Sequence, residues 1–313
     1  MLVDDAPAAL LHVGRFSQYA HRVIFVEKKD VWKYVDNIEA IEPWGWDLAL
    51  AFQLRQAGIP QHLLPPDDEL AVLRKLASRH TSAAVLQILK ANVGNKALTG
   101  ESKYVEGLPE LKATIAEYGQ AVLKAPWSSS GRGIRYVSGE LDSLMENWAG
   151  KVMERQQGLT VEPYYNKVKD FAMEFSVVNG KVSYCGLSVF YTAKSAYTGN
   201  VLTGEEDKKA VLEQYIDPIV LEKVKDAIVR LIGEMLPAGY CGAFGVDMMV
   251  VACHSNKQTE PSGFLLHPMV EINLRRTMGH VALSLSSGST DIKRVMRIDY
   301  DGSHYRLHIN KIR

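Results

Sequence analysis

The segment from Ala121 to Val137 constrains the fold most, because it joins a lysine to a loop of small residues between two strand-like runs. An apolar run leads to Lys124, a loop rich in serine and glycine occupies 128–133, and a second strand-like run begins at Ile134. Glycines let the backbone approach an anion, consecutive N–H groups and hydroxyls supply donors, and the lysine adds a point charge. The pattern predicts either a flap over a phosphate group or an ordinary hairpin with a polar tip.

Two well-known phosphate-binding motifs do not describe this segment. A Walker loop carries its lysine after the last glycine, at the start of a helix, whereas Lys124 precedes the glycines. A dinucleotide-binding fingerprint needs a further glycine three residues after Gly133, and that position holds Tyr136. If the loop binds phosphate, it belongs to another architecture.

Length and charge limit the class of protein. A chain of 313 residues exceeds the usual size of one domain, so two or more subdomains are expected. Its 36 basic and 36 acidic residues cancel, which argues against a nucleic-acid or anionic-membrane partner. The first residues lack a basic region and a long apolar run, and no run of about 18 apolar residues occurs elsewhere. We therefore expect a cytoplasmic protein without a membrane span.

The three cysteines agree with a reducing compartment. Cys185, Cys241 and Cys253 form no C-x-x-C pair and no cluster with histidine. Free thiols of this kind are usually small packed residues, and we expect these three to be reduced and packed.

Residues 1–95 have the pattern of an N-terminal α/β domain. A strand is expected at 22–27 and a helix at 46–58, which ends at Gly58. Acidic residues open a further helix at 67, where the helix dipole favours them. Another helix is expected at 81–90, and the stretch 92–103 is rich in Gly, Asn, Lys and Ser, as linkers are.

The remaining two thirds of the chain predict an α+β arrangement with antiparallel strands. Asn179-Gly180 between two strand-like runs is a strong hairpin signal. Apolar residues at helical spacing predict a long amphipathic helix at 218–236. The other expected elements are helices at 108–118 and 140–155, strands at 159–165, 171–178, 181–192, 243–252 and 264–274, and a terminal hairpin at 297–309.

Oxygen-bearing side chains interrupt two apolar strands near the C-terminus. Asp247 lies in one of them, and Glu271 and Asn273 lie two residues apart in the other. A strand has a side-chain period of two, so Glu271 and Asn273 share one face while Ile272 points to the other. Mg²⁺ prefers such oxygen ligands together with phosphate oxygens and water. Isolated acids in strands are more often structural, so the metal interpretation depends on the phosphate flap upstream.

The segment 160–175 offers a backbone edge for a base. Pro163 has no N–H group, so the chain exposes the carbonyl of Glu162 and the N–H of Tyr164 next to it. An acceptor beside a donor is what the edge of adenine requires, and this pair is the predicted adenine contact.

The three pieces occur in the order found in the ATP-grasp superfamily. Glu271-Ile272-Asn273-Leu274-Arg275 is similar to the family's Glu-Ile-Asn-Pro-Arg, with leucine in place of proline. The resemblance covers roughly residues 96–290, and 1–95 is compatible with the domain that usually precedes this fold. It implies a lid subdomain at 96–158 with the Ser/Gly flap and a C-terminal subdomain at 159–313 with the Mg²⁺ site.

The resemblance also implies a role for each matching residue. Lys124 would contact the phosphates of ATP, and Arg275 would steady the transferred phosphoryl group, so both are the predicted catalytic residues. Glu162 and Tyr164 would bind adenine, and Asp170 would accept hydrogen bonds from ribose, with Glu174 as its alternative. The flap would consist of Ser129, Ser130, Gly131 and Gly133, and one or two Mg²⁺ ions would bind Asp247, Glu271 and Asn273.

The implied activity is that of an ATP- and Mg²⁺-dependent ligase. Such an enzyme activates a carboxylate as an acyl phosphate, which an amine or a thiol then attacks. The alternatives left open are a nucleotide-binding module without catalysis and a small-molecule kinase on the same fold. The predicted partners are a small carboxylate and an amine or thiol, with no nucleic acid or membrane; a dimer is only the base-rate expectation.

For some polar residues outside these motifs, a structural role is preferred over a functional one. Arg79 could give a second phosphate contact, but a surface arginine is preferred. Tyr197 and Asn200 could face the substrate, but a solvated loop around 197–204 is preferred. Trp127, beside the flap, is expected either to stack on a ligand or to pack the lid.

Overall fold

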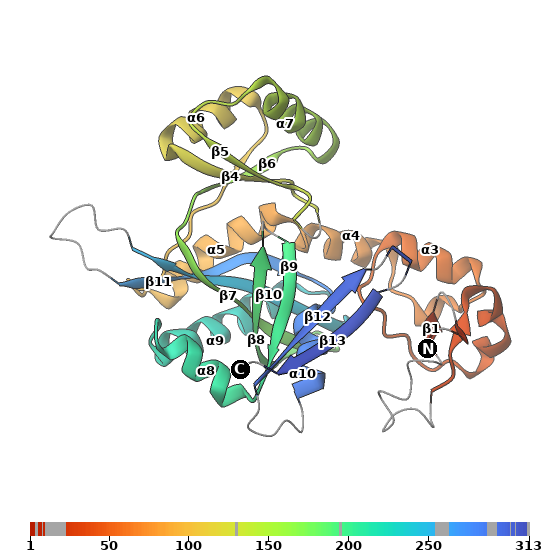
Figure 1. The fold of residues 1–313 in the computed structure, drawn as a ribbon. Helices are drawn as coiled ribbons and strands as arrows, with labels where there is room; N and C mark the ends of the chain where they lie inside the picture. Colours follow the sequence, from red (N-terminus) through yellow and green to blue (C-terminus); the bar gives the residue numbers. More distant parts are fainter. Residues whose placement is uncertain are drawn as a thin grey trace. The chain divides into compact units, whose positions relative to one another are not determined.

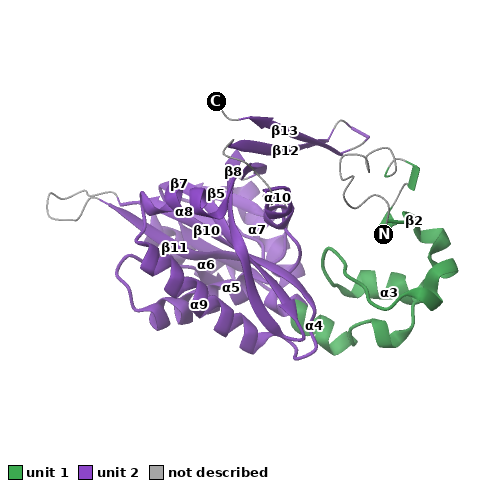
Figure 2. Cartoon of the chain, turned by 90° about the horizontal axis from the view of Figure 1, so that it is seen from below, with its two compact units in different colours: residues 1–73 green, residues 74–313 purple. Residues whose placement is uncertain are grey.

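The computed structural model describes two compact units, residues 1–73 and 74–313 (Figure 2). It describes residues 1–3, 6–7, 9, 23–128, 131–193, 196–253, 263–286, 293–300, 302–303 and 305–311. The division falls at Leu73, whereas the sequence pattern placed it near residue 95. The difference comes from α5 (Arg79–Val93), which packs on β11 (Phe264–Asn273) and α9 (Pro218–Met235) of the second unit.

The first unit is a small mixed assembly. β1 (Leu2–Val3) pairs in parallel with β2 (Val26–Glu27), and a 3₁₀ helix follows at Lys28–Asn37. α3 (Leu48–Gln56) begins where the Asp47 side chain accepts a hydrogen bond from the N–H of Leu50, 2.7 Å away. α4 (Asp67–Leu76) opens with three acidic residues, as expected. The unit has its own core of buried apolar residues: Val31, Leu54, Ile59 and Leu64.

A seven-stranded antiparallel sheet forms the larger part of the second unit (Figure 1). Its strand order is β11-β10-β7-β8-β9-β12-β13. The strands not yet described are β10 (Gly242–Ala252), β7 (Lys167–Val178), β8 (Lys181–Ala193), β9 (Ala196–Leu202), β12 (Arg294–Tyr300) and β13 (Tyr305–Lys311). Asn179 and Gly180 join β7 to β8, both with positive φ, as the hairpin signal predicted.

Helices cover this sheet. α9 packs on β8 and on α5, and α8 (Glu205–Glu213) packs on β8. α10 (Met278–Ser286) lies against β8, β9 and β7. In the apolar stripe predicted for α9, Val220, Val224 and Ile228 are almost fully inaccessible, whereas Met235, at the C-terminal end, is exposed.

A four-stranded antiparallel sheet carries the flap. Its order is β3-β6-β4-β5, with bounds β3 (Lys103–Val105), β6 (Leu159–Pro163), β4 (Gln120–Lys124) and β5 (Ile134–Ser138). Two helices, α6 (Leu108–Tyr118) and α7 (Ser143–Gln156), pack against it around a core that includes Leu111, Leu123 and Val161. β6, expected in the C-terminal subdomain, belongs to this sheet.

Two local predictions were wrong. The stretch expected to be a solvated loop around 197–204 contains strand β9, because Asn200 pairs with Phe190 of β8 and Met296 of β12. Cys185 and Cys241 are exposed and Cys253 is half-buried, so packing does not account for these cysteines. Within the described residues, no helix combines the length and apolarity needed to cross a membrane.

Candidate active site

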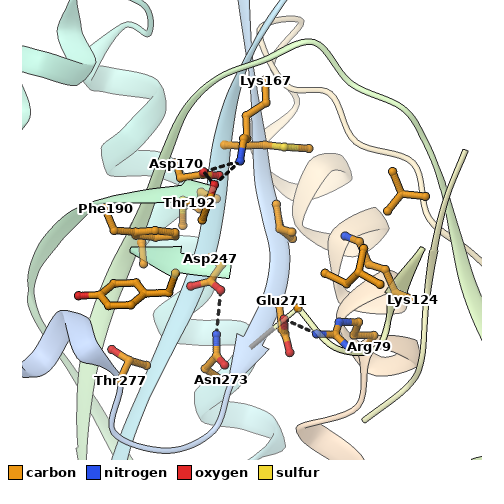
Figure 3. Close-up of a pocket in the computed structure, with 18 of the residues that line it drawn as sticks. Arg79, Lys124, Lys167, Asp170, Phe190, Thr192, Asp247, Glu271, Asn273 and Thr277 are labelled. Atoms are coloured by element: carbon orange, nitrogen blue, oxygen red, sulfur yellow. Dashed lines mark hydrogen bonds and ion pairs between the residues drawn. The ribbon is translucent and has the colours of Figure 1, made fainter. Parts of the chain in front are cut away.

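A cavity of about 450 Å³ is lined by residues of both sheets of the second unit. The small sheet contributes Lys124 and Glu162, and the large sheet contributes Asp170, Asp247 and Glu271. The residues that line the cavity begin at Arg79, so the described wall belongs entirely to residues 74–313. Figure 3 shows the labelled side chains along this wall.

Lys124 lies at the end of β4 and is almost completely buried, with an exposed fraction of 6%. Its Nζ donates to Oε2 of Glu162 at 2.6 Å, and Glu162 is equally buried on the neighbouring strand β6. The sequence predicted that Lys124 faces phosphate, and the structure adds that Glu162 holds it through its side chain. A buried pair of this kind keeps the ammonium group fixed at the cavity wall.

The backbone pair predicted to contact adenine, the carbonyl of Glu162 and the N–H of Tyr164, is directed into the small sheet. The N–H of Tyr164 donates to the carbonyl of Gln120 at 2.9 Å, so it belongs to the β4–β6 ladder. Because backbone groups alternate along a strand, the carbonyl of Glu162 faces the same way, toward Val122 of β4. The carbonyl of Pro163 and the N–H of Tyr165 face the opposite way, and both residues line the cavity.

Asp170 and Glu174 lie four residues apart on one face of β7 and both line the cavity. Asp170 accepts from Nζ of Lys167 at 2.5 Å and from Oγ1 of Thr192 at 2.7 Å, as Figure 3 shows. Lys167 follows Tyr165 closely in sequence, so Asp170 occupies the end of the face nearest Pro163–Tyr165. Glu174 lies at the other end.

Asp247, Glu271 and Asn273 come together as predicted. Asp247 and Glu271 are directly paired across β10 and β11, and Nδ2 of Asn273 donates to Oδ2 of Asp247 at 3.0 Å (Figure 3). Oδ1 of Asn273 accepts from Nη2 of Arg275 at 3.0 Å. Desolvation, reinforced by the Glu271 carboxylate, raises the pKa of Asp247 to about 7.

This donor set fits a magnesium ion that also binds phosphate. Two paired carboxylates and one amide are hard oxygen donors, and two carboxyl groups directly paired across neighbouring strands favour a cation beside them. The described residues contain no group of three or more His, Cys, Asp or Glu suited to a metal. If Mg²⁺ binds these residues, phosphate oxygens and water would complete its coordination shell.

Arg79, which the sequence analysis preferred as a surface residue, is only 3% exposed. Its Nη2 donates to Oε2 of Glu271 at 2.7 Å (Figure 3). Its Nη1 donates to the carbonyl of Ala125 at 2.7 Å and to Oγ of Ser128 at 2.6 Å. The only sequence signal was its place just after Ser78, the residue that caps α5.

Glu174 is buried against the start of α10. Burial raises the pKa of Glu174 to about 8, in opposition to a hydrogen bond from Thr277. Burial lowers the pKa of His280, whose Nε2 lies 3.1 Å from the carbonyl of Phe175 and whose Nδ1 accepts from the N–H of Thr277. Oε2 of Glu174 lies 3.1 Å from that Nδ1 without a well-aligned hydrogen bond. A neutral imidazole beside a protonated carboxyl group is the consistent assignment.

A buried polar network faces the cavity from β9, where a solvated loop was expected, and from the neighbouring strand β8. Tyr197 donates to Oδ1 of Asn200 at 2.5 Å, and Nδ2 of Asn200 donates to Oγ of Ser188 at 2.7 Å. Asn200 and Ser188 are almost inaccessible, and all three residues line the cavity. Period-two alternation places Ser188 on the same face of β8 as Phe190 and Thr192, which also line the cavity, but it does not place the two residues on β9.

The loop between β4 and β5 is described in part. Ser129 and Ser130, predicted flap residues, lie outside the described residues. Gly131 lines the cavity with a φ of 72°, and Gly133 accepts from the N–H of Ala125 at 2.9 Å. Trp127 is not among the residues that line the cavity, and its ring packs on α4: its Nε1 donates to the carbonyl of Arg74, and the Arg74 guanidinium stacks on its ring.

Comparison with known proteins identifies relatives in structure only. No protein-family model matches the chain, and a search of curated proteins finds no match. Among solved structures, the biotin carboxylase of Campylobacter jejuni in a β,γ-ATP complex matches with a TM-score of 0.58 at 13% identity. The alignment covers 95% of this chain and 74% of that one.

Two further structures match over a similar span. The biotin carboxylase domain of the 2-oxoglutarate carboxylase of Hydrogenobacter thermophilus, with MgADP, ADP and bicarbonate, gives a TM-score of 0.57 at 14% identity, covering 95% of this chain and 73% of that one. The N5-carboxyaminoimidazole synthase of Aspergillus clavatus, with ADP and 5-aminoimidazole ribonucleotide, gives 0.51 at 12% identity, covering 96% and 80%. At these identities the matches establish the fold.

Proposed function

We propose, from the ATP-grasp fold that this chain shares with those structures, that it is an ATP- and Mg²⁺-dependent ligase. It would activate a carboxylate as an acyl phosphate for attack by an amine or a thiol. The observation that carries the proposal is that one cavity collects a backbone edge for a base, two buried cations and a pair of carboxylates. This set matches the base, the phosphates and the metal of a bound nucleotide in that order.

The end of the cavity next to Pro163–Tyr165 would hold the nucleoside. The carbonyl of Pro163 and the N–H of Tyr165 offer an acceptor and a donor for the adenine edge. Asp170 keeps a second carboxylate oxygen beyond its bonds to Lys167 and Thr192, which suits a ribose hydroxyl donor. This geometry favours Asp170 over Glu174 for the ribose, since Glu174 is buried further along β7, away from Pro163–Tyr165.

The phosphates would lie between the two sheets. Lys124 and Arg79 present cationic groups to the cavity, and Arg275 continues the face that carries Asn273. Asp247, Glu271 and Asn273 would hold one or two Mg²⁺ ions, which neutralise charge on the phosphates when bound. Phosphoryl transfer depends mainly on positioning and on such neutralisation, so no catalytic histidine is needed.

The protein's own residues would position the reactants and exclude water. The substrate carboxylate attacks the γ-phosphorus of ATP, ADP leaves, and the acyl phosphate forms beside Arg275. A nucleophile then attacks the acyl carbon and releases phosphate. The flap over the phosphates would protect the acyl phosphate from hydrolysis. The bicarbonate and aminoimidazole ribonucleotide bound in the neighbouring structures are consistent with small polar substrates.

The test is ADP release by the purified protein with ATP, Mg²⁺ and pools of carboxylates, amines and thiols. Lys124→Met and Glu271→Gln should each reduce substrate-dependent ADP release by at least about 100-fold. Lys103→Met is the matched control, because Lys103 pairs with Glu117 at the surface of the same small sheet. Full activity in both site variants contradicts the proposal.

Product analysis separates the other two activities. Phosphate retained on the product would identify a kinase. Nucleotide binding in calorimetry without turnover on any substrate would identify a binding module.

A further inference from the structure

Arg79 contacts two parts of the cavity that are far apart in sequence. We infer that Arg79 is a positioning residue that couples the carboxylate of Glu271 to the base of the flap. The flap base is defined here as Ala125–Ser128 together with Gly131–Gly133. The role of Glu271 as a metal ligand rests on the proposed function, but the contact between the two parts does not.

On one side, Arg79 fixes the flap base. Its Nη1 donates to Ala125 and Ser128, and its own N–H donates to the carbonyl of Pro126 at 3.1 Å. The N–H of Ala125 in turn donates to Gly133, and a Cβ on Gly133 would lie 2.4 Å from the Ser128 side chain. Both ends of the loop are therefore in contact with each other, and Arg79 holds the first of them.

On the other side, the first turn of α5 is fixed to β11. Nη2 of Arg79 donates to Glu271, and Oγ of Ser82 accepts from the N–H of Ile272 at 3.1 Å. Glu271 and Ile272 lie on the strand that carries the predicted metal ligands. Movement of the Glu271 side chain therefore acts directly on the guanidinium group.

The ion pair with Glu271 stabilises the buried position of the Arg79 guanidinium group. It lies at the start of a helix, where the dipole disfavours a cation, and its Nε is buried without a hydrogen-bond partner. Within the described residues, Glu271 is the carboxylate with which Arg79 forms an ion pair. A cation that takes over the charge of Glu271 weakens this attraction, and the hold of Arg79 on Ser128 and Ala125 changes with it.

A packing role for Arg79 would also disturb both regions when the residue is changed. Only coupling predicts that a change at Glu271 alters the flap base, and that a change at Ser128 alters metal affinity. The hydrogen bonds described for Glu271 and Ser128 do not join the two residues directly. Both side chains instead accept from the guanidinium group of Arg79. These two crossed effects are therefore the measurements to make.

The first experiment uses the full chain without metal or nucleotide. Amide hydrogen exchange of Ala125, Trp127, Ser128 and Gly131–Gly133 is followed in wild type, Glu271→Met and Arg79→Met. Both variants should exchange about tenfold faster in the flap base. In the Arg79→Met background, adding Glu271→Met should cause no further increase. This result needs neither ATP turnover nor metal binding, so it stands or falls separately from the proposed function.

The second experiment measures Mn²⁺ affinity in the presence of ADP by electron paramagnetic resonance. Arg79→Met should weaken Mn²⁺ binding about 10–100-fold, as the loss of a group that orients a ligand does. Ser128→Ala should weaken it about threefold in wild type and have no effect in the Arg79→Met background. Arg79→Lys, which keeps the charge but cannot reach both partners, should restore part of the affinity without the coupling.

Arg135→Met is the control for a general effect on the loop. Arg135 donates to the carbonyls of Arg132 and Ile134 and stacks on Trp148, with no contact to Glu271. It should accelerate exchange in the loop and leave Mn²⁺ affinity unchanged. The inference is overturned if Glu271→Met leaves flap exchange at the wild-type rate, or if Ser128→Ala changes Mn²⁺ affinity equally with and without Arg79. If Arg79→Met does not fold, the Ser128→Ala effect in the Arg79→Lys background decides.

Discussion

Two ion pairs, one buried and one with a half-buried carboxylate, contribute to the charge of the cavity wall. Lys124 pairs with Glu162 in the small sheet, and Arg79 pairs with Glu271 between α5 and the large sheet. Removing one partner of a buried pair leaves the other charge uncompensated, which costs more than the pair contributes. Structural and functional effects of the same side chain therefore have to be separated at this scale.

Lys124→Met should lower the free energy of unfolding by about 3–5 kcal/mol, because the Glu162 carboxylate is left buried without its cation. Adding Glu162→Gln should restore most of this stability, because it removes the carboxylate charge that Lys124→Met leaves unpaired. It should not restore ADP release. Urea denaturation and the ADP assay on the single and double variants measure the two effects. Equal stability of the two variants would contradict the account of the pair.

Glu174 should make the metal-free protein less stable as pH rises from about 5 to 8. Its folded-state pKa of about 8 exceeds the ordinary value of 4.5, so the folded state keeps a proton that the unfolded state releases. Asp247, with a pKa raised to about 7, has the same sign, whereas the lowered pKa of His280 has the opposite sign below about pH 6.5.

Glu174→Gln should therefore flatten the decline in stability without abolishing it. Denaturant midpoints between pH 5 and 8 test this, with Glu234→Gln on the exposed side of α9 as the control. An unchanged slope in Glu174→Gln would show that this carboxyl group is not protonated in the folded protein.

At the scale of elements, the first turn of α10 packs directly against the Glu174 carboxylate of β7. A Cβ added to Gly279 would lie 1.8 Å from Oε1 of Glu174 and 2.7 Å from Oγ of Ser188. The glycine in the first turn of this helix is therefore required by close packing against β7 and β8 and not by its backbone angles. A Cβ added to Gly245 of β10 would lie 2.5 Å from Oε2 of the same carboxylate.

Gly279→Ala should destabilise the protein by about 1–3 kcal/mol, as overpacking does, even though alanine favours a helix. Adding Glu174→Ala should relieve the clash and recover part of the loss. Gly150→Ala, in α7 where no atom lies within 4 Å of the added Cβ, is the control and should be neutral or stabilising by up to about 1 kcal/mol. Chemical denaturation of the four proteins measures this, and equal effects at both glycines would refute it.

At the scale of the whole molecule, the cavity wall comes from two sheets and the start of α5, all within residues 74–313. A ligand that contacts both sheets binds the folded state and not the unfolded one. Binding therefore adds to stability by mass action.

Mg²⁺ and ADP at about 100 times the dissociation constant should add about 2.7 kcal/mol and raise the melting temperature by about 5–10 °C. Glu271→Gln should lose the part of the melting-temperature shift that depends on Mg²⁺. The double variant Lys124→Met/Glu162→Gln should lose most of the total shift. Thermal unfolding followed by circular dichroism is the measurement. Absence of any shift in wild type would contradict nucleotide binding.

Much of this molecule could be predicted from local pattern. The strand that delivers Lys124, the Asn179-Gly180 hairpin and the buried stripe of α9 depend on neighbouring residues alone, and all three are found. The shared face of Glu271 and Asn273 follows from the period of a strand, and the order of the motifs was enough to predict the ATP-grasp fold, which the structural matches confirm.

Tertiary structure decided what depends on register and on distant partners. Which backbone groups of 162–165 face the cavity is set by pairing with β4, and a shift of one residue exchanges the two sets. Asn200 became part of a buried wall because β8 and β12 pair with its strand. Arg79 is buried because Glu271, 192 residues later in the chain, lies beside it. Local sequence fixes which way a side chain alternates, but the charges it meets come from strands and helices that only the folded chain brings together.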